Sequence, residues 1–587
     1  MKDKYYIGLA STFHDPAIAI LDRDGTVIFA ESTERYLQNK RAMGSPADTE
    51  IWIENQIRNY CPNAAEAEFH ISTTWSQNYV NSLKLFYNLG FYNFSPTAII
   101  RKTIHTAYKS MLPNENLVWF LNKQFASNIQ TGANLERTLR WSFNNNSIKR
   151  YRFNHHETHA AYSAFSSTFD NATCLVVDGI GEKGSVSYFK YADNQLELKG
   201  HHKGSESLGF FYTLITLLCE FNPIAGEEWK VMGLAPYGKK DDTYYKLLNS
   251  LISIKDCNVK FKNNPNLILK VIGVINEDLN GSKESVFAKK ANLAYTGQLL
   301  FSEYMIELLN NLYKKGYSEN LALSGGCALN SAFNGKIICE TNFKELYIPS
   351  APGDDGTAIG AAYLSLKRDR PDMKMVRTNK LSPYLGNQIN DQEVENYIKF
   401  SGNKRVEKYP GMVHMVTAKL LAQGKLIGWS QGRAEFGPRA LGNRSILADP
   451  RKVDMKDVIN SRIKFREEFR PFAPSILAEY GNNYFEDYQD SPYMERTLKF
   501  KDEVLSKIPA VVHVDQTGRL QSVSKDLNPT FHALIDCFNQ LTGVPIILNT
   551  SFNVMGKPII NSFQDALNVF YNSGLDVLVI NDYVISK

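Results

Sequence analysis

Histidines cluster in the stretch YRFNHHETHAAYSAF, residues 151–165, where three of the eleven histidines of the chain fall within five positions. On a helix, His155 and His159 are four residues apart and share one face, about 6 Å apart along the axis, which suits a shared metal ion. His156 points elsewhere. The same spacing is typical of a solvated helix face, so the histidines alone leave both interpretations open.

Two other segments carry acids that could complete a metal site. Asp178 ends the apolar run CLVV, and Asp354 and Asp355 lie in the turn GDDG, before a segment of small residues. Histidines and carboxylates together form a set of nitrogen and oxygen ligands that favours Fe, Mn or Zn over a metal that prefers sulfur. The acids therefore favour a metal site, and at this point either Asp354 or Asp355 could belong to it.

Arginine and lysine concentrate in residues 432–475, among glycines, prolines and aromatic residues. Arginine can bind phosphate or carboxylate oxygens through two parallel hydrogen bonds, and lysine adds a point charge. Acidic residues are interleaved, so a salt-bridged surface is the alternative. Arg439 and Arg444 stand five residues apart in the loop FGPRALGNRS, which has no helical face to solvate, and this favours a small phosphorylated substrate. The cations are Arg433, Arg439, Arg444, Arg451, Arg462, Lys464, Arg466 and Arg470.

Further polar residues follow apolar runs, in the loops where α/β domains usually place their sites. His14 follows the first apolar run, in STFHDPA, and a general base could stand there because histidine titrates near neutral pH. Lys230 lies in AGEEWKVMGLAPYGKK, which is consistent with a loop that lines a polar ligand. Two later loops carry His513, Asp515 and Arg519, and Asn549, Ser551 and Asn553.

These residues need a scaffold, and residues 5–31 predict one. They read as strand, loop, strand, hairpin turn and strand, and residues 173–200 repeat this pattern. Residues 321–337 add a short strand, a Gly-Gly turn and a helix, and residues 349–366 add a turn that enters a helix of small residues. The sequence thus predicts an internally duplicated α/β fold, as in sugar kinases, actin and Hsp70-type ATPases, a similarity of fold and not of function.

The composition changes at residues 367–388, which are charged, contain proline and lack periodic apolar residues. We predict a linker there, between a first domain over residues 1–366 and a second α/β domain over residues 389–587. The buried strands expected in the second domain include KLIGWS and GVPIILN.

Composition limits the class of protein. A net charge of +5 over 587 residues gives no global basic field, so nucleic acid is not expected as a partner. The seven cysteines are odd in number and never spaced C-x-x-C, which fits a reducing compartment. No apolar run approaches the length of a membrane helix, and the N-terminus lacks a signal-peptide pattern. We predict a cytoplasmic protein without a membrane partner.

Six motifs, in order along nearly the whole chain, resemble the O-carbamoyltransferase family, whose members carbamoylate antibiotics and nodulation factors. They are HHETHAAYSAF, LVVDGIGE, EEWKVMGLAPYG, LSGGCALN, EFGPRALGNRSILADPR and FRPFAPS. The resemblance implies a Kae1-like domain of the actin/Hsp70 fold followed by a YrdC-like domain. It also implies that the YrdC-like domain converts carbamoyl phosphate and ATP to carbamoyl adenylate, phosphate and pyrophosphate, and that the Kae1-like domain passes the carbamoyl group to a hydroxyl.

The resemblance also implies roles for single residues. His14 would be the general base for the acceptor hydroxyl. A divalent metal, Fe²⁺ in the family with Mn²⁺ or Zn²⁺ as alternatives, would be held by His155, His159, Asp178 and Asp354, which the family spacing favours over Asp355. Carbamoyl phosphate and ATP, the latter with Mg²⁺, would be held by Arg439, Lys464, Arg470, Arg519 and Ser551. The site for carbamoyl adenylate would be lined by Lys230, Gly325, Gly326 and Asn330. His156 would touch the adenylate phosphate or pack, and a homodimer is the family expectation.

Three other functions share parts of this pattern. A tRNA threonylcarbamoyl-transferring fusion has both domain types, but the modest net charge and the GPRALGNRSILADPR segment argue against it. A hydrogenase maturation factor normally adds an acylphosphatase domain and C-x-x-C zinc fingers, which this sequence lacks. The third is a non-catalytic nucleotide-binding scaffold.

Because adenylates hydrolyse readily, we expect the two sites to face one another along a path shielded from water. The sequence does not identify the acceptor, whose pocket we expect to include parts of residues 75–150 and 240–295.

Overall fold

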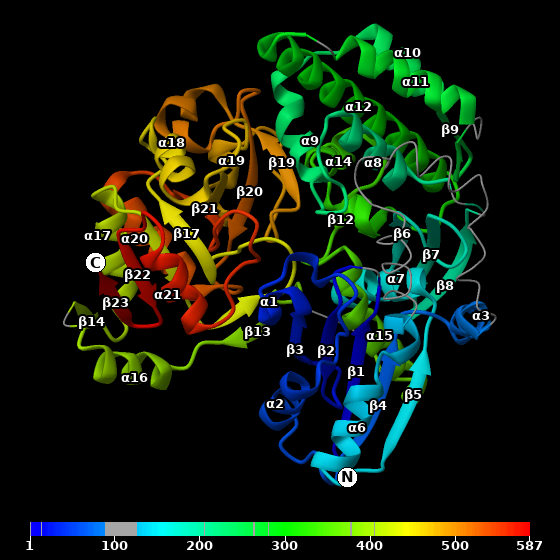
Figure 1. Cartoon of the computed structure of the whole chain (residues 1–587), viewed down its shortest axis with the longest axis horizontal. Coiled ribbons are helices and arrows are strands. Elements are labelled where there is room, and N and C mark those ends of the chain that lie inside the picture. The colour runs from blue at the N-terminus through cyan, green and yellow to red at the C-terminus, as the bar shows by residue number, and fades with distance from the viewer. Residues whose placement is uncertain are drawn as a thin grey trace.

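The computed structural model describes residues 2–12, 14–88, 126–202, 204, 206–261, 265–279, 281–375, 379–403 and 405–587. Of the segments expected to form the acceptor pocket, 75–150 and 240–295, residues 89–125 lie outside the described ones. Figure 1 shows the N-terminal sheet at the bottom, a group of helices above it and the C-terminal half at the side.

The first sheet has five strands in the order β3-β2-β1-β4-β5. β1 pairs antiparallel with β2 and parallel with β4, and β5 is parallel to β4 at the edge. A hydrogen-bonded turn at Asp22–Gly25 joins β2 to β3. The strands are β1 (Lys4–Ala10), β2 (Ala17–Leu21), β3 (Val27–Ser32), β4 (Glu68–Thr73) and β5 (Ile148–Arg152), with α1 (Thr33–Leu37), α2 (Glu50–Tyr60), α3 (Gln77–Asn88) and α6 (Ala133–Ser142) among them.

The second sheet repeats the arrangement, in the order β12-β11-β6-β7-β8. An antiparallel meander of three strands is again followed by two strands parallel to the first of them. This confirms the predicted internal duplication. The strands are β6 (Ala172–Val177), β7 (Val186–Ala192), β8 (Gln195–His201), β11 (Asn320–Ser324) and β12 (Glu345–Tyr347).

Two helices made largely of small residues pack between these sheets. α7 (His155–Ser166) contacts β6 and β11, α15 (Thr357–Asp369) contacts β1 and β4, and the two helices contact one another. A Cβ atom on Gly360 would lie 1.8 Å from the carbonyl oxygen of Thr158, so the close crossing requires glycine. The small side chains of both segments thus bring the start of α7 near the start of α15.

A helical layer covers the second sheet, and its apolar residues share one core with β6 and β11 (Figure 1). It comprises α8 (Leu208–Leu218), α9 (Glu228–Leu234), α10 (Asp242–Asn249), α11 (Pro265–Asp278) and α12 (Lys283–Tyr313), with the hairpin β9 (Ile252–Lys255) and β10 (Asn258–Phe261), and α13 (Ser331–Asn334) and α14 (Ile337–Glu340) follow β11.

The C-terminal half is built on a nine-stranded mixed sheet in the order β14-β23-β22-β15-β17-β21-β18-β20-β19. The strands are β14 (Val406–Lys408), β15 (Ile427–Ser430), β17 (Arg444–Ala448), β18 (Ala473–Leu477), β19 (Arg496–Lys499), β20 (Thr517–Val523), β21 (Ile546–Ser551), β22 (Val577–Ile580) and β23 (Tyr583–Ser586). The accompanying helices are α16 (Asp391–Ser401), α17 (Val413–Ala422), α18 (Met455–Ile459), α19 (Gly481–Tyr484), α20 (Pro529–Thr542) and α21 (Phe563–Tyr571). Their apolar faces form a single core with the sheet.

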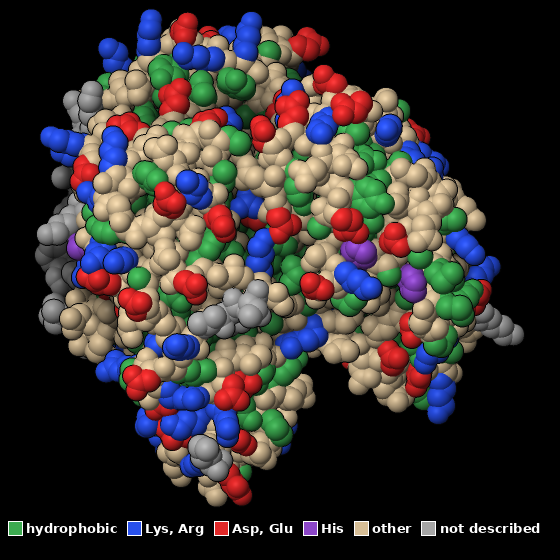
Figure 2. Space-filling model, turned by 180° about the vertical axis from the view of Figure 1, so that it is seen from behind, with side chains coloured by type: hydrophobic (Ala, Val, Ile, Leu, Met, Phe, Trp, Pro, Cys, Tyr) green, Lys and Arg blue, Asp and Glu red, His purple; other side chains and the backbone are tan. Residues whose placement is uncertain are grey.

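The segment predicted as a linker, residues 367–388, contains regular structure at both ends. α15 continues to Asp369, and β13 (Tyr384–Gln388) pairs with β16 (Arg433–Glu435) and contacts β3. The backbone amide of Asn387 donates to Glu31 Oε1 at 3.0 Å, which joins the two halves. Basic and acidic side chains are interspersed over the surface in Figure 2, as the modest net charge suggests. Within the described part of the chain, no helix is both long and apolar enough to cross a membrane.

Candidate metal centre and anion-binding cavity

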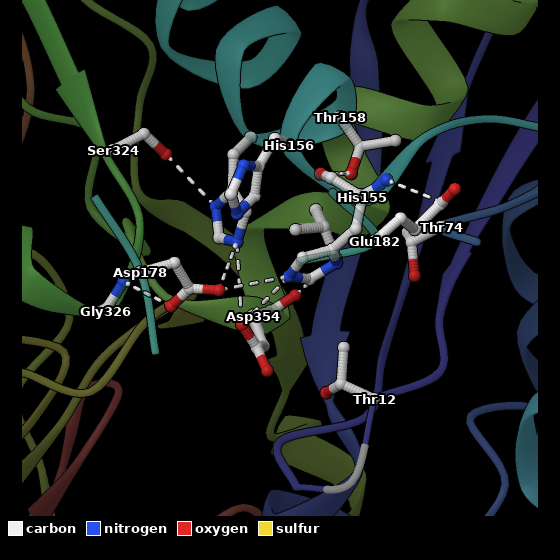
Figure 3. Close-up of polar contacts among 12 residues, drawn as sticks. Thr12, Thr74, His155, His156, Thr158, Asp178, Glu182, Ser324, Gly326 and Asp354 are labelled. Carbon is white, nitrogen blue, oxygen red and sulfur yellow. Dashed lines mark hydrogen bonds and ion pairs between the residues drawn. The ribbon is translucent and has the colours of Figure 1, made fainter. Parts of the chain in front are cut away.

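Two histidines and two aspartates converge where α7, β6 and α15 begin or end. Asn154 caps α7 by accepting from the backbone amides of His156 and Glu157, which fixes His155 as the first helical residue. Asp178 follows β6, and Asp354 begins the short helical turn that enters α15. Figure 3 shows His155, Asp178 and Asp354 pointing toward one another. His159 joins them, and one ligand atom from each of the four residues lies within 4.8 Å of the others.

The spacing of these atoms fits a metal ion. His155 Nε2 lies 3.3 Å from Asp178 Oδ2 and 3.6 Å from Asp354 Oδ1. His159 Nε2 lies 4.0 Å from Asp178 Oδ2 and 3.5 Å from Asp354 Oδ1. Ligands bound at about 2.1 Å in tetrahedral geometry would be about 3.4 Å apart. His159 Nε2 is buried without a hydrogen bond, and an ion among the four side chains would give it a partner.

The electrostatics agree with this fit. Burial lowers the pKa of His155, but hydrogen bonds and charge from Asp178 and Asp354 outweigh burial and raise that pKa to about 10. Burial raises the pKa of Asp354, but the histidines outweigh it and hold that pKa well below its usual value. The two buried carboxylates are thus ionised and require positive charge nearby. A divalent cation bound by the two carboxylates and two neutral imidazoles would supply that charge.

Groups behind the four side chains hold them in place. Gly326 N donates to Asp178 Oδ1 at 3.0 Å, and Ser324 Oγ lies 3.2 Å from His159 Nδ1. The Trp75 ring stacks on the His155 ring, with centroids 4.6 Å apart and planes at 8°. Glu182 Oε1 accepts from the backbone amides of Ser76 at 2.7 Å and of His155 at 3.2 Å. Such partners set ligand orientation in metal sites. No pattern in the sequence indicates a role for Trp75, and Glu182 stands in the sequence only as the last residue of the motif LVVDGIGE.

The structure separates the residues that the sequence left open. Asp355 accepts from Ser32 Oγ at 3.2 Å and is not one of the four clustered side chains, so Asp354 is the acid of the cluster. His156 Nδ1 bonds to Ser187 Oγ at 2.7 Å and its ring packs against Gly181. His156 therefore belongs to the packing of α7, as one of the two predicted alternatives stated.

His14 lies beside the cluster and lines a large cavity. Its Nδ1 is 2.8 Å from Asp15 Oδ2 and 3.7 Å from Asp354 Oδ2. Burial and Arg41 lower the pKa of His14, but the two aspartates outweigh them and raise it. Asp15, in turn near Arg41 at 3.7 Å, orients the imidazole at the cavity wall.

Residues predicted for the adenylate take different positions. Gly326 and Asn330 line the cavity, and Asn330 also caps α13 by accepting from Phe333 N at 3.0 Å. Gly325 turns the chain with φ 93°, and a Cβ there would meet the carbonyl oxygen of Val177 at 2.4 Å, so its role is to shape the backbone. Lys230 Nζ lies 2.6 Å from Glu227 and 2.6 Å from Glu467, where it joins the two halves.

Four arginines from the C-terminal half line the other wall of the cavity: Arg439, Arg466, Arg470 and Arg519. Burial lowers the pKa of Arg470 and of Arg519 to about 10, so both stay charged at neutral pH. Glu467, 3.6 Å from Arg470, is already paired with Lys230. The guanidinium of Arg470 also stacks over Trp229 of the N-terminal half at 3.8 Å. Concentrated arginine charge of this kind suits phosphate oxygens.

Lys464 supports this wall from behind. Its buried ammonium donates to Ser551 O at 2.5 Å, Ser551 Oγ at 3.2 Å and Asn553 Oδ1 at 2.7 Å. The N–H donors of Lys464 are therefore used in hydrogen bonds within the protein. Ser551 lines the cavity. Arg466 was counted among the basic residues of the sequence but had no predicted role. It occupies the cavity wall two residues after Lys464, because Phe465 takes a left-handed conformation with φ 47° between them.

Arg444 corrects an interpretation made from the sequence. The loop FGPRALGNRS suggested that Arg439 and Arg444 both face a substrate, but Arg444 is fully buried in β17. Its guanidinium donates to the carbonyl oxygens of Gln431 at 3.0 Å, Asn443 at 2.8 Å and Asn387 at 2.9 Å. It fastens the loop that carries Arg439, whereas Arg439 itself lines the cavity.

A single cavity of about 1330 Å³ joins the metal cluster to the arginines. His14, His155, Asp178 and Asp354 lie on the wall from the N-terminal half, and Arg439 and Arg519 lie on the wall from the C-terminal half. Acidic side chains outnumber lysines and arginines on the first wall, and the reverse holds on the second. The candidate metal ligands and the arginines thus face one another across one cavity, as expected, and the path shielded from water stays a prediction.

Comparison with known proteins identifies the family. The model described as carbamoyltransferase N-terminus matches residues 5–363, and the one described as carbamoyltransferase C-terminus matches residues 418–587. An uncharacterised protein of Synechocystis sp. is 32% identical, over 99% of this chain and 97% of its own length. Nodulation protein NolO of Bradyrhizobium diazoefficiens is 33% identical, over 74% of this chain and 79% of its own length. A crystal structure of full-length HypF, in a phosphate- and nucleotide-bound form, is 13% identical with a TM-score of 0.36, covering 64% of this chain and 56% of that one.

These matches span both halves of the chain, which belongs to the carbamoyltransferase family. It is an enzyme, a transferase of carbamoyl groups. The resemblance inferred from the six motifs is confirmed.

Proposed function

We propose that this chain is an ATP-dependent O-carbamoyltransferase in which the two halves perform successive reactions. In this proposal a YrdC-like domain over residues 389–587 converts carbamoyl phosphate and ATP to carbamoyl adenylate. A Kae1-like domain over residues 1–366, of the actin/Hsp70 fold, then transfers the carbamoyl group to a hydroxyl of a small natural product or sugar. The observation that carries the proposal is the cavity with arginines on one wall and the metal cluster with His14 on the other.

The chemistry divides between the walls by charge. Water first cleaves carbamoyl phosphate to carbamate and phosphate. A carbamate oxygen then attacks the α-phosphorus of ATP and expels pyrophosphate, which leaves carbamoyl adenylate. Each of these steps handles phosphoryl charge, which Arg439, Arg470 and Arg519 would bind, with Mg²⁺ accompanying ATP. Lys464 would hold Ser551 in position against the same groups.

In the transfer step, the acceptor oxygen bonds to the carbamoyl carbon as the bond from that carbon to AMP breaks. His14 would take the hydroxyl proton, because it lines the cavity next to Asp354 and is oriented by Asp15. A divalent metal held by His155, His159, Asp178 and Asp354, Fe²⁺ in this proposal with Mn²⁺ or Zn²⁺ as alternatives, would polarise the carbamoyl oxygen when bound. Because both walls belong to one cavity, the adenylate would pass from one wall to the other without leaving the protein, which would limit its hydrolysis.

The test combines carbamoyl phosphate, ATP and a panel of hydroxylated sugars and metabolites, with mass spectrometry for a product that has gained one carbamoyl group. We expect AMP release that depends on both carbamoyl phosphate and a small alcohol. AMP release only with tRNA and threonine would instead support a threonylcarbamoyl-transferring enzyme. If Lys464→Ala and Arg470→Ala left carbamoyl-phosphate-dependent ATP turnover intact, the assignment of the basic wall would be wrong.

A further inference from the structure

A second cavity, of about 530 Å³, lies at the outer edge of the first sheet, where β5 is the edge strand. Cationic side chains from three elements line it. β5 contributes Arg150 and Arg152, α3 contributes Lys84, and α15 contributes Arg368, whose guanidinium lies over the Tyr151 ring at 5.0 Å. This cavity is separate from the one between the halves, and none of its lining residues takes part in the proposed transfer reaction.

The positive charge of this cavity is only partly balanced. Arg150 Nη1 lies 3.1 Å from Glu136 Oε2, and the same carboxylate also pairs with Arg140 at 2.9 Å. The hydrogen bonds of Arg152 go to Thr73 Oγ1 and to backbone carbonyl oxygens, at 3.3 to 3.4 Å. Among the described residues that line the cavity there is no aspartate or glutamate. Burial, and then the charge of Arg150, lower the pKa of Arg152 to about 10. Cations held together in this way are stabilised by an anion.

Lys149, next to Arg150 on β5, differs from the arginines of the cavity because acidic side chains balance its charge. Lys149 points to the opposite face of β5, where its Nζ lies 2.6 Å from Glu68 Oε1. Lys4 pairs there with Asp369 at 2.8 Å, and His70 lies 2.7 Å from Glu68. Lysines and acids balance on that face, which argues against a metal ion among Glu68, His70 and Asp369. On the other face, Arg150 shares the Glu136 carboxylate with Arg140, and among the described residues Arg152 bonds only to uncharged oxygen atoms.

We propose that this cavity binds a phosphate-bearing small molecule. Two guanidinium groups from β5 and one from α15 can bind phosphate oxygens through paired hydrogen bonds, and Lys84 adds a fourth charge. The volume suits a ligand larger than a single phosphate. β5 runs parallel to β4, and the cavity is lined by the last residues of β5, Arg150 to Arg152. The carboxyl ends of parallel strands are common places for ligand sites in α/β sheets. β5 leads directly into α7, so the ligand would bind on the strand that precedes His155.

Binding of inorganic pyrophosphate, measured by titration calorimetry, tests the proposal. The Arg439→Gln/Arg519→Gln variant removes charge from the large cavity, and we expect it to retain one pyrophosphate site. Adding Lys84→Gln/Arg368→Gln should weaken that site by about tenfold or more, the loss expected for two charge-assisted contacts. Adding Lys149→Gln instead, a control on β5 that lies outside the lining of the cavity, should change the affinity by less than about twofold. Equal affinity with and without Lys84 and Arg368 would overturn the proposal.

A second measurement locates the anion without any substitution. Crystals of the wild-type chain soaked with tungstate should show an anomalous peak among Lys84, Arg152 and Arg368. A cavity left empty at a concentration that fills the arginine wall of the large cavity would contradict the site. Citrate distinguishes the chemistry of the ligand. Pyrophosphate should bind this site more tightly than citrate, and equal or tighter binding of citrate would overturn the assignment to phosphate.

Discussion

Replacing Glu182 by Gln keeps the shape of the side chain and removes the charge that ties the start of α3 to the start of α7. Glu182 Oε1 accepts from Ser76 N at 2.7 Å and from His155 N at 3.2 Å, and Oε2 accepts from Ser76 Oγ at 2.5 Å. His155 is both the first residue of α7 and a candidate ligand. The substitution therefore weakens the support of a ligand and leaves all four ligand groups in the chain.

The magnitude follows from the contacts. A hydrogen bond to a charged group contributes about 1 kcal/mol more than one to a neutral group. The bond to His155 N loses this amount, and the negative charge at the N-terminus of α7 contributes about 0.3–1 kcal/mol more. The sum, about 1.3–2 kcal/mol, corresponds to metal affinity weakened by about ten- to thirtyfold. Groups behind metal ligands typically have effects of about 10–100-fold.

The assay is competition for the metal between the protein and a chelator of known affinity, for the wild type, Glu182→Gln and Glu157→Gln. Glu157 stands in the same first turn of α7 and is not among the described residues that line the large cavity. Its substitution removes a charge near the same helix end but no hydrogen bond to His155, so the affinity should fall by no more than about fivefold. Equal metal affinities for all three proteins would refute the argument that Glu182 supports His155.

Three further predictions concern other parts of the chain. Asp354→Asn should lose the metal, measured as metal-to-protein ratio after gel filtration, while Asp355→Asn should retain it; the reverse would exchange their roles. Arg519→Met should raise the KM for carbamoyl phosphate by about 10–100-fold, because charge-assisted hydrogen bonds are lost. The rate of carbamoyl transfer from supplied carbamoyl adenylate should stay unchanged. An unchanged KM would show that Arg519 does not bind carbamoyl phosphate. Burial raises the pKa of Glu31 to about 7, from an ordinary value of 4.5. The folded chain therefore keeps a proton that the unfolded chain releases, and stability is lost as pH rises from about 4.5 through about 7. Glu31→Gln should remove this loss. In urea unfolding, its free energy of unfolding should exceed that of wild type by up to about 3 kcal/mol near pH 8 and by little near pH 4. Equal pH dependence of the two proteins would contradict the burial argument.

Periodicity made much of the metal cluster predictable from the sequence. The helical repeat places His155 and His159 on one face, and Asp178 and Asp354 end or precede elements whose apolar patterns are clear. The internal duplication was predictable for the same reason, because each meander shows its turns and apolar runs. The residues alone left Asp354 and Asp355 open, since both acids stand in one turn, and only the family spacing favoured Asp354, which is the acid of the cluster.

The basic wall was harder to resolve because no period governs it. Arg439 and Arg444 stand in one loop, yet Arg439 lines the cavity and Arg444 binds backbone carbonyls. The left-handed residue Phe465 sends Lys464 into the protein and Arg466 to the cavity, and nothing in local propensity marks that change. Trp75, which follows β4, stacks on His155 at the start of α7, a contact between segments far apart in the sequence.

The central claim is that two reactions take place on opposite walls of one cavity, and isotope exchange between pyrophosphate and ATP separates them. The measurement compares wild type with His159→Ala, each with carbamoyl phosphate and an acceptor that wild type carbamoylates. The account predicts that His159→Ala loses its metal and forms no carbamoylated acceptor, but exchanges pyrophosphate at a rate close to wild type. Loss of carbamoyl-phosphate-dependent exchange together with transfer, in a folded variant, would contradict the division of the chemistry between the two walls.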